Sequence, residues 1–174
     1  MKKYYSILIA TFAMGLFAST ASAAAAKPAF PSWSQQINTT KRFTVLTAFG
    51  GAAVLDNETG LVWEKQPSTG VGDWIDRLTR CYTLEVGGRK GWRVPTIEEL
   101  ASLVDTSQLA PTLPAGHPFI NVQLGFYWSA TTIANDTSLV WGVDFNTGGV
   151  GIGNKSGGHF VSCVRGGQGI DGVQ

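Results

Sequence analysis

The sequence predicts an α+β fold with two helices, a small irregular antiparallel sheet and long loops. Helical apolar spacing occurs twice, within residues 73–88 and within residues 96–105. Short β-rich runs lie on both sides of these two segments. Residues 106–125 show no periodic pattern, which adds a long loop to the expected architecture.

The N-terminus has the organisation of a secretory signal peptide. Lys2 and Lys3 precede an apolar run at residues 7–18, and residues 21–23 have the small-residue pattern of a cleavage site. We therefore predict a signal peptide over residues 1–23 and an exported protein, periplasmic or extracellular, that meets the membrane only during export. A retained membrane anchor is the alternative.

The rest of the chain divides into three parts by composition. Residues 24–41 are expected to form a flexible leader, residues 42–167 the folded domain, and residues 168–174 a disordered tail. Trp33 lies in the leader and is expected either to dock on the domain or to pack loosely.

The charge of the chain is nearly balanced. Its 13 basic and 12 acidic side chains give a formal net charge of +1. Removing residues 1–23 takes away Lys2 and Lys3 and leaves 11 basic and 12 acidic side chains. Because nucleic-acid-binding surfaces carry an excess of positive charge, the sequence predicts no nucleic-acid partner.

Cys81 and Cys163 are the two cysteines of the chain. In an exported protein an even pair predicts one disulfide, which would close a loop of about 80 residues and stabilise the fold by roughly 4–5 kcal/mol at most. Two buried free thiols and a reactive pair are the alternatives.

The first strands of the domain are short. Residues 43–47, 53–55 and 61–63 are β-rich, and the turn-formers Asp56 and Gly60 lie between the last two runs. This order predicts a hairpin in which Gly60 adopts a positive φ. It favours turn formation over a calcium loop at this position, because the full spacing of calcium ligands is missing.

The first helix is expected to begin after Asp73, whose carboxylate accepts a backbone N–H as N-cap. Trp74, Leu78 and Cys81 follow at i, i+4 and i+7, so they are expected to face the core. The helix is expected to end near residues 86–88, where two glycines stand.

A rigid corner precedes the second helix. Pro95 favours an extended conformation for Val94, and Thr96 with Glu99 three residues later predicts a capping box. The helix is expected to stop near Asp105. Its buried face is expected to carry Ile97, Leu100, Ala101 and Val104.

Side chains around this corner are expected to have structural roles. Arg93 and Arg165 neighbour predicted core residues, where an arginine usually bonds to a carboxylate or to backbone carbonyls, and anion binding is the alternative. The predicted structural corner consists of Trp92, Arg93, Pro95, Thr96, Glu99, Trp128 and Arg165.

Residues 106–125 contain three prolines and form a long irregular loop. Such a loop is unusual unless it binds a ligand, covers a core or belongs to a loop-rich fold. His117 lies inside it, and a lone histidine without a second metal ligand at suitable spacing is expected to be polar loop content.

The last third of the domain is β-rich, with a turn expected at residues 146–149. Trp141, Val143 and Phe145 alternate along one run and are expected on the same face of a strand. The four strands expected here span residues 126–132, 139–145, 150–155 and 160–167.

Tryptophan fills protein cores more often than it binds sugars, although its ring stacks well on the apolar face of a sugar. Trp141 is the best candidate for partial exposure, and it forms the candidate ligand-binding set with Asn135 and Asp144. Asp136, Asp144 and Asn146 are a calcium set that no motif supports. The tryptophans assigned to the core are Trp63, Trp74, Trp92 and Trp128.

Catalytic motifs are missing from the sequence. It has no Gly-x-Ser-x-Gly elbow, no His-Glu-x-x-His motif and no phosphate-binding loop. Glu98 and Glu99 are adjacent and point to different helix faces, so they are not placed as a hydrolytic pair. We therefore expect no enzymatic activity and no cofactor.

Five segments occur in a characteristic order: Asp56-x-x-Thr59-Gly60-Leu61-x-Trp63, Trp74…Cys81, Gly91-Trp92-Arg93-Val94-Pro95-Thr96-x-x-Glu99-Leu100, Tyr127-Trp128-Ser129-Ala130-Thr131 and Cys163-Val164-Arg165-Gly166-Gly167. This ordered set resembles the Lcl C-terminal domain family, named after a Legionella collagen-like adhesin. The resemblance covers about residues 50–167.

The resemblance implies a disulfide between Cys81 and Cys163 and a fold akin to C-type lectin-like and formylglycine-generating-enzyme-like domains. In the adhesin, the domain is associated with sulfated glycans and with trimer formation. The present sequence contains no collagen-type Gly-x-y run. The formylglycine enzymes use cysteines for copper and oxygen chemistry, and a bridged pair leaves none for it.

These observations predict a secreted, non-enzymatic module that binds a carbohydrate or another cell-surface ligand. The alternative is a structural or protein-interaction module of the bacterial envelope that binds no small ligand. An enzyme is the third hypothesis. An exposed aromatic side chain beside polar loop residues would favour the first hypothesis over the second.

Overall fold

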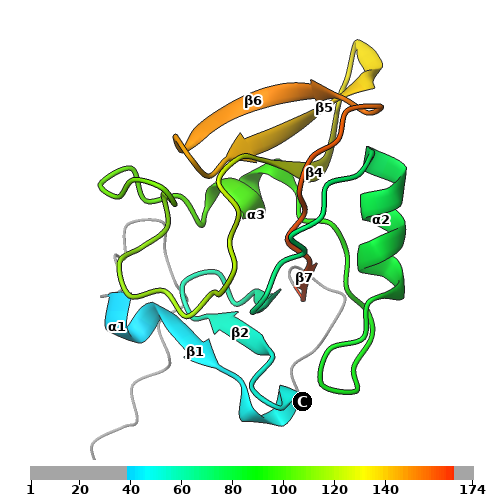
Figure 1. Ribbon diagram of the computed structural model, residues 1–174. Helices are drawn as coiled ribbons and strands as arrows, with labels where there is room; N and C mark the ends of the chain where they lie inside the picture. Colours follow the sequence, from blue (N-terminus) through cyan, green and yellow to red (C-terminus); the bar gives the residue numbers. More distant parts are fainter. Residues whose placement is uncertain (1–38, 167–174) are drawn as a thin grey trace, which may run out of the picture. The chain divides into compact units, whose positions relative to one another are not determined.

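The computed structural model describes residues 39–166 (Figure 1). The predicted signal peptide, most of the predicted leader with Trp33, and the predicted tail lie outside the described residues. Within residues 39–166, no helix has the length and apolar character that a membrane span requires.

The predicted α+β fold is confirmed, and its strands form two antiparallel sheets rather than one. One sheet has the strand order β1-β2-β3-β7 and the other has the order β4-β5-β6. The helices are the single-turn α1 (Thr39–Arg42), α2 (Trp74–Thr83) and α3 (Ile97–Ala101). The strands are β1 (Phe43–Val45), β2 (Ala53–Asp56), β3 (Val62–Glu64), β4 (Phe126–Ile133), β5 (Asp136–Asp144), β6 (Gly149–Asn154) and β7 (Val164–Arg165).

The predicted hairpin is formed by β2 and β3. Gly60 has a φ of 74°, and its N–H donates to the carbonyl of Asp56 (2.8 Å). The buried carboxylate of Asp56 accepts two hydrogen bonds from Arg42 (3.1 and 2.9 Å). Asp56 therefore serves the turn and an ion pair, as expected for a structural rather than a calcium-binding residue.

Two predicted strands are shorter in the structure. The strand predicted at residues 43–47 ends two residues early, because Thr47–Phe49 forms the 3₁₀ helix η1. The strand predicted at residues 160–167 is reduced to β7. There, the N–H of Cys163 donates to the carboxylate of Glu64 (2.7 Å) instead of a strand carbonyl, which interrupts the ladder.

Both predicted helices have their predicted N-caps and end earlier than expected. The side chain of Asp73 accepts the N–H of Asp76 (2.8 Å) at the start of α2. α2 ends before residues 86–88 because Leu84 is extended. α3 ends before Asp105, because the N–H groups of Leu103 and Val104 bond to carbonyls three residues back instead of four.

The loop at residues 106–125 contains no helix or strand, as predicted, and it covers the core. Leu113 and Phe119 are buried in the main hydrophobic cluster. The N–H of Thr112 donates to the carbonyl of Phe145 (2.9 Å), which attaches the loop to the end of β5. The ring of His117 lies 5.8 Å from that of Phe119, and burial lowers the pKa of this histidine.

Three of the four tryptophans assigned to the core are buried, namely Trp63, Trp92 and Trp128. The assignment is wrong for Trp74, which is only partly buried. Its indole N–H donates to the carbonyl of Ser129 (2.9 Å), and the Lys155 ammonium lies 4.0 Å from its ring centre. The ring therefore packs under a surface lysine rather than in the core.

The predicted disulfide between Cys81 and Cys163 is present, and residues 39–166 contain no free cysteine. It links α2 to the segment before β7. Beside it, Arg80 donates to both carboxylate oxygens of Glu64 (2.9 and 2.7 Å), which connects α2 to β3.

The predicted corner contains the capping box, with reciprocal bonds between Thr96 and Glu99. Arg93 donates to both oxygens of Glu99 at 2.7 Å. It also donates to the carbonyl of Gly166 (2.8 Å). Through these bonds Arg93 holds α3 against the C-terminal strand region.

The other corner residues connect to neighbouring elements. The carbonyl of Pro95 accepts a backbone N–H from β4 (2.7 Å). The indole of Trp128 donates to the carbonyl of Gly72 (3.1 Å), just before α2. The guanidinium of Arg165 lies 5.9 Å from the ring centre of Phe49.

Replacing Glu99 with Gln is expected to lower the free energy of unfolding at pH 7 by about 1–2 kcal/mol, because it removes a charge-assisted pair. Burial alone would raise the pKa of Glu99, but the hydrogen bonds from Arg93 and Thr96 and the charge of Arg93 lower it overall. The stabilisation is therefore present above the unfolded-state pKa and is lost as the pH falls through the lower folded-state pKa.

Urea unfolding at a series of pH values measures this effect. The difference between Glu99→Gln and the wild type should shrink at acidic pH, where the wild-type carboxyl is also neutral. Glu98→Gln is the matched control, because Glu98 is the exposed neighbour of Glu99. Equal losses in both variants would contradict the role given to Glu99.

Removing the disulfide with the double variant Cys81→Ser, Cys163→Ser is expected to cost about 2–5 kcal/mol of unfolding free energy. The bridge spans 82 residues, so it restricts a large part of the unfolded chain. Urea unfolding measures the loss. A reductant should bring the wild type to the stability of the variant and leave the variant unchanged, and a reductant effect on the variant would contradict this explanation.

Candidate functional site

Trp141 lies in the middle of β5 and is 37% exposed, as the sequence predicts. Ile152 of β6 stands directly opposite it, and Val150 lies on the same face two residues away. Val143 shares this face and is buried, so the core ends between Val143 and Trp141. The surroundings of Trp141 on this face are therefore mainly apolar.

Asn135 and Asp144 do not join Trp141, so the predicted ligand-binding set does not form. Asn135 lies in the turn before β5, whereas Asp144 ends that strand. A nine-residue strand extends about 30 Å, which separates the two side chains. Asp144 also points to the face opposite Trp141, and it accepts the N–H of Asn146 (2.8 Å).

The predicted calcium-binding set of Asp136, Asp144 and Asn146 does not converge either, because β5 separates Asp136 from the other two residues. Asp136 and Asp144 stand at opposite ends of β5. The carboxylate of Asp136 is occupied by Ser138, which donates its hydroxyl (2.6 Å) and its N–H (3.0 Å). Across residues 39–166, no group of three His, Cys, Asp or Glu side chains is placed to hold a metal ion.

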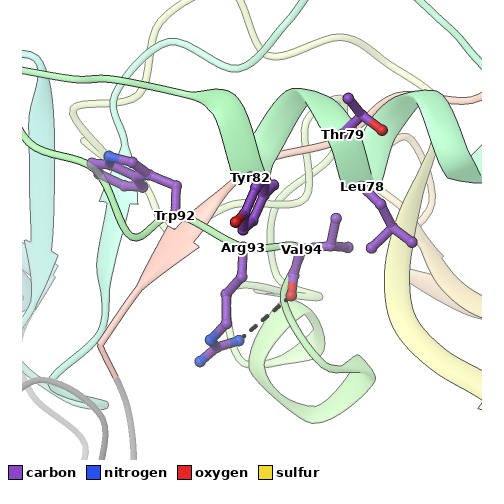
Figure 2. Close-up of a pocket in the computed structure, with 6 residues that line it drawn as sticks. All are labelled: Leu78, Thr79, Tyr82, Trp92, Arg93 and Val94. Atoms are coloured by element: carbon purple, nitrogen blue, oxygen red, sulfur yellow. Dashed lines mark hydrogen bonds between the residues drawn. The ribbon is translucent and has the colours of Figure 1, made fainter.

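A pocket of ≈ 370 Å³ lies between α2 and the extended residues 92–94, which we call the corner segment (Figure 2). Leu78 and Tyr82 project from α2 toward the extended segment that leads into α3 (Figure 2). The residues that line the pocket are Leu78, Thr79, Tyr82, Trp92, Arg93 and Val94. Its volume falls within the range that small-molecule sites usually have.

The floor of this pocket is apolar and its rim carries hydroxyl groups. Trp92 and Val94 are buried beneath it, and Leu78 is partly buried. Tyr82 is 82% exposed, so nearly its whole ring is open to solvent at the edge of the pocket. Thr79, one residue beyond Leu78 on α2, is exposed and adds a second hydroxyl.

The polar groups of the corner segment are already occupied. The indole N–H of Trp92 donates to the carbonyl of Arg89 (3.0 Å). The guanidinium of Arg93 points away from α2 (Figure 2) and is paired with Glu99. The pocket wall is therefore rigid and close to electrically neutral, and its lining includes no carboxylate, histidine or cysteine.

Tyr82 and Thr79 line the pocket but were not among the site residues predicted from the sequence. Tyr82 follows Leu78 at i+4, which places it at the border of the buried face of α2. That spacing is compatible with either burial or exposure. The exposure of the ring depends on where the segment of residues 92–94 lies beside α2, and the helix pattern contains no information about that segment.

A family model described as the Lcl C-terminal domain matches residues 52–165, which is more than half of the chain. The matched region includes both cysteines of the disulfide, the corner segment and all residues that line the pocket. A search of the curated proteins finds no match.

Calcium is expected to leave the thermal unfolding midpoint unchanged, because the acidic residues of β5 do not converge. A ligand that binds the folded state raises the midpoint, so unfolding with calcium or with a chelator measures binding directly. A rise with calcium that disappears in Asp136→Asn or Asp144→Asn would contradict this expectation.

Proposed function

Because the chain belongs to the Lcl C-terminal domain family, we propose that it is an exported, non-enzymatic module that binds a carbohydrate of a cell surface. The pocket between α2 and residues 92–94 is the proposed site. It replaces Trp141 as the leading site, because the pocket is concave and carries hydroxyl groups, whereas Trp141 lies among apolar side chains.

The exposed ring of Tyr82 is the observation that carries this proposal. A sugar ring presents an apolar C–H face together with hydroxyl groups. An aromatic ring on a helix supplies a rigid stacking surface for such a face, and its hydroxyl supplies a hydrogen-bonding group. The disulfide at the neighbouring Cys81 and the buried Trp92 and Val94 fix the backbone on both sides of the pocket, so the site needs little further ordering of the chain.

The electrostatics of the pocket favour a neutral part of the ligand at this position. Arg93 is the one charged residue of the lining, and its guanidinium is bonded to Glu99 and to the carbonyl of Gly166. An anion at this pocket would have to compete with the Glu99 carboxylate. Thr79 and Tyr82 therefore provide the polar contacts, and the apolar floor provides the rest.

Export is supported by the disulfide. Disulfides persist in oxidising compartments and are rare in reducing ones. The bond between Cys81 and Cys163, together with the predicted signal peptide, leads us to propose a periplasmic or extracellular location.

Binding to a panel of neutral and sulfated glycans tests the proposal. Tyr82→Ala should weaken saturable binding by roughly tenfold, because it removes the stacking surface. Tyr82→Phe keeps the ring and should retain most of the affinity. Trp141→Ala is the matched control at the other exposed aromatic residue and should leave binding unchanged.

Two outcomes would overturn the proposal. One is an absence of saturable binding to every glycan, which would favour an envelope module that binds proteins and no small ligand. The other is binding that Tyr82→Ala leaves intact and Trp141→Ala removes, which would return the site to β5.

A further inference from the structure

The sheet of β4, β5 and β6 has one covered edge and one open edge. At the β4 edge, the backbone N–H of Trp128 donates to the carbonyl of Phe160 (2.9 Å), and that of Ala130 donates to the carbonyl of Pro95 (2.7 Å). β6 is the outer strand on the other side (Figure 1). Within residues 39–166, no strand pairs with its outer edge.

The pairing register shows which groups of β6 point outward. The N–H of Lys155 donates to the carbonyl of Ser138 (2.9 Å), in the same register that pairs β6 with β5. Hydrogen-bonded pairs alternate along an antiparallel ladder, so residues 149, 151 and 153 direct their N–H and C=O groups toward β5. Val150 and Ile152 therefore direct theirs toward the open edge.

The two faces of β6 differ. Gly151 and Gly153 lie beneath aromatic rings, and a Cβ on Gly153 would come within 2.8 Å of the Trp128 ring. Gly153 therefore has no room for a side chain, because the Trp128 ring packs directly on its backbone, whereas a Cβ on Gly151 would make ordinary contact with the Phe126 ring. On the other face, Val150 is 52% exposed and Ile152 is 54% exposed, next to the exposed Trp141.

β6 lacks the features that usually prevent strands from pairing with other chains. Edge strands are commonly protected by lysine, by proline, by a bulge or by a covering segment. The six residues Gly149–Asn154 include no charged residue and no proline, and their register with β5 is continuous. A strand with apolar side chains at alternate positions fits this edge best, because those side chains would contact Val150 and Ile152.

We propose that β6 pairs antiparallel with β6 of a second copy of this chain, around a two-fold axis at Gly151. Val150 of each copy then faces Ile152 of the other, and both residues offer outward N–H and C=O groups. Each such pair exchanges both of its backbone hydrogen bonds. The two three-stranded sheets become one six-stranded sheet.

Chemistry and charge favour this occupant. β6 is itself an uncharged strand with apolar side chains at alternate positions, so it fits the open edge of a second copy. Cross-strand contacts between Val150 and Ile152 shield apolar surface that is otherwise exposed. Because the pairing is antiparallel, the two Lys155 residues lie at opposite ends and do not repel each other.

Sedimentation of the exported chain over a range of concentrations tests the proposal, with a monomer–dimer equilibrium as the expected result. Ile152→Pro removes one outward N–H and leaves the bonds to β5 in place. The two-fold axis applies this loss twice, so the dimer dissociation constant should rise roughly tenfold or more. Ile152→Val keeps the N–H and a branched apolar side chain, and it should dimerise like the wild type.

Ile152→Lys is a second test that does not change the backbone. It places two like charges near the axis and should also prevent pairing. Far-UV circular dichroism, which reports the backbone fold, and glycan binding should remain unchanged in both variants, since the Tyr82 pocket lies on other elements. A monomer at every concentration would overturn the proposal, as would a dimer or larger oligomer that neither substitution weakens.

Discussion

The hydrogen bonds to the buried carboxylate of Glu64 are the interaction on which the arrangement of β3, α2 and the C-terminal segment depends. The side chain of Glu64 is 3% exposed and accepts two bonds from Arg80 and one from the N–H of Cys163. A buried ion whose partner moves away is left uncompensated, at a cost of several kcal/mol. β3, α2 and the C-terminal segment are therefore held in one geometry, and the disulfide adds a covalent bond between the last two.

The pocket is a consequence of this connection. α2 is attached to the C-terminal segment through Cys81 and Cys163, and the corner is attached to it through Arg93, which bonds to the carbonyl of Gly166. Two elements fixed to the same segment are also fixed relative to each other. The backbone of Tyr82 is thereby held beside the segment of Trp92 and Val94.

The two exposed surfaces offer different chemistry. The Tyr82 pocket presents a ring, two hydroxyl groups and an apolar floor on rigid elements, which suits a ligand with both apolar and polar faces. The edge of β6 presents backbone hydrogen-bonding groups and the side chains of Val150 and Ile152, which suits another strand. The two surfaces lie on different secondary-structure elements. A dimer paired through β6 would therefore leave both Tyr82 pockets open to ligand.

The sequence alone determined the features that depend on residues close together in the chain. The caps at Asp73 and Thr96 and the turn at Gly60 were predictable, because a few neighbouring residues satisfy the backbone groups involved. The pairing of the cysteines followed from their number. The tertiary structure decided which side chains are buried and which distant side chains lie close together.

Trp74 has the spacing of a core residue, but its ring is only partly buried, with its N–H bonded to Ser129 and the Lys155 ammonium over its face. Asn135 and Asp144 are near each other in the sequence and far apart in space, because β5 is fully extended between them. The exposure of Tyr82 depends on where the corner segment lies, and a helix pattern contains no information about that segment. Periodicity predicts which side chains share a face, whereas the packing of distant segments decides which of these faces are covered.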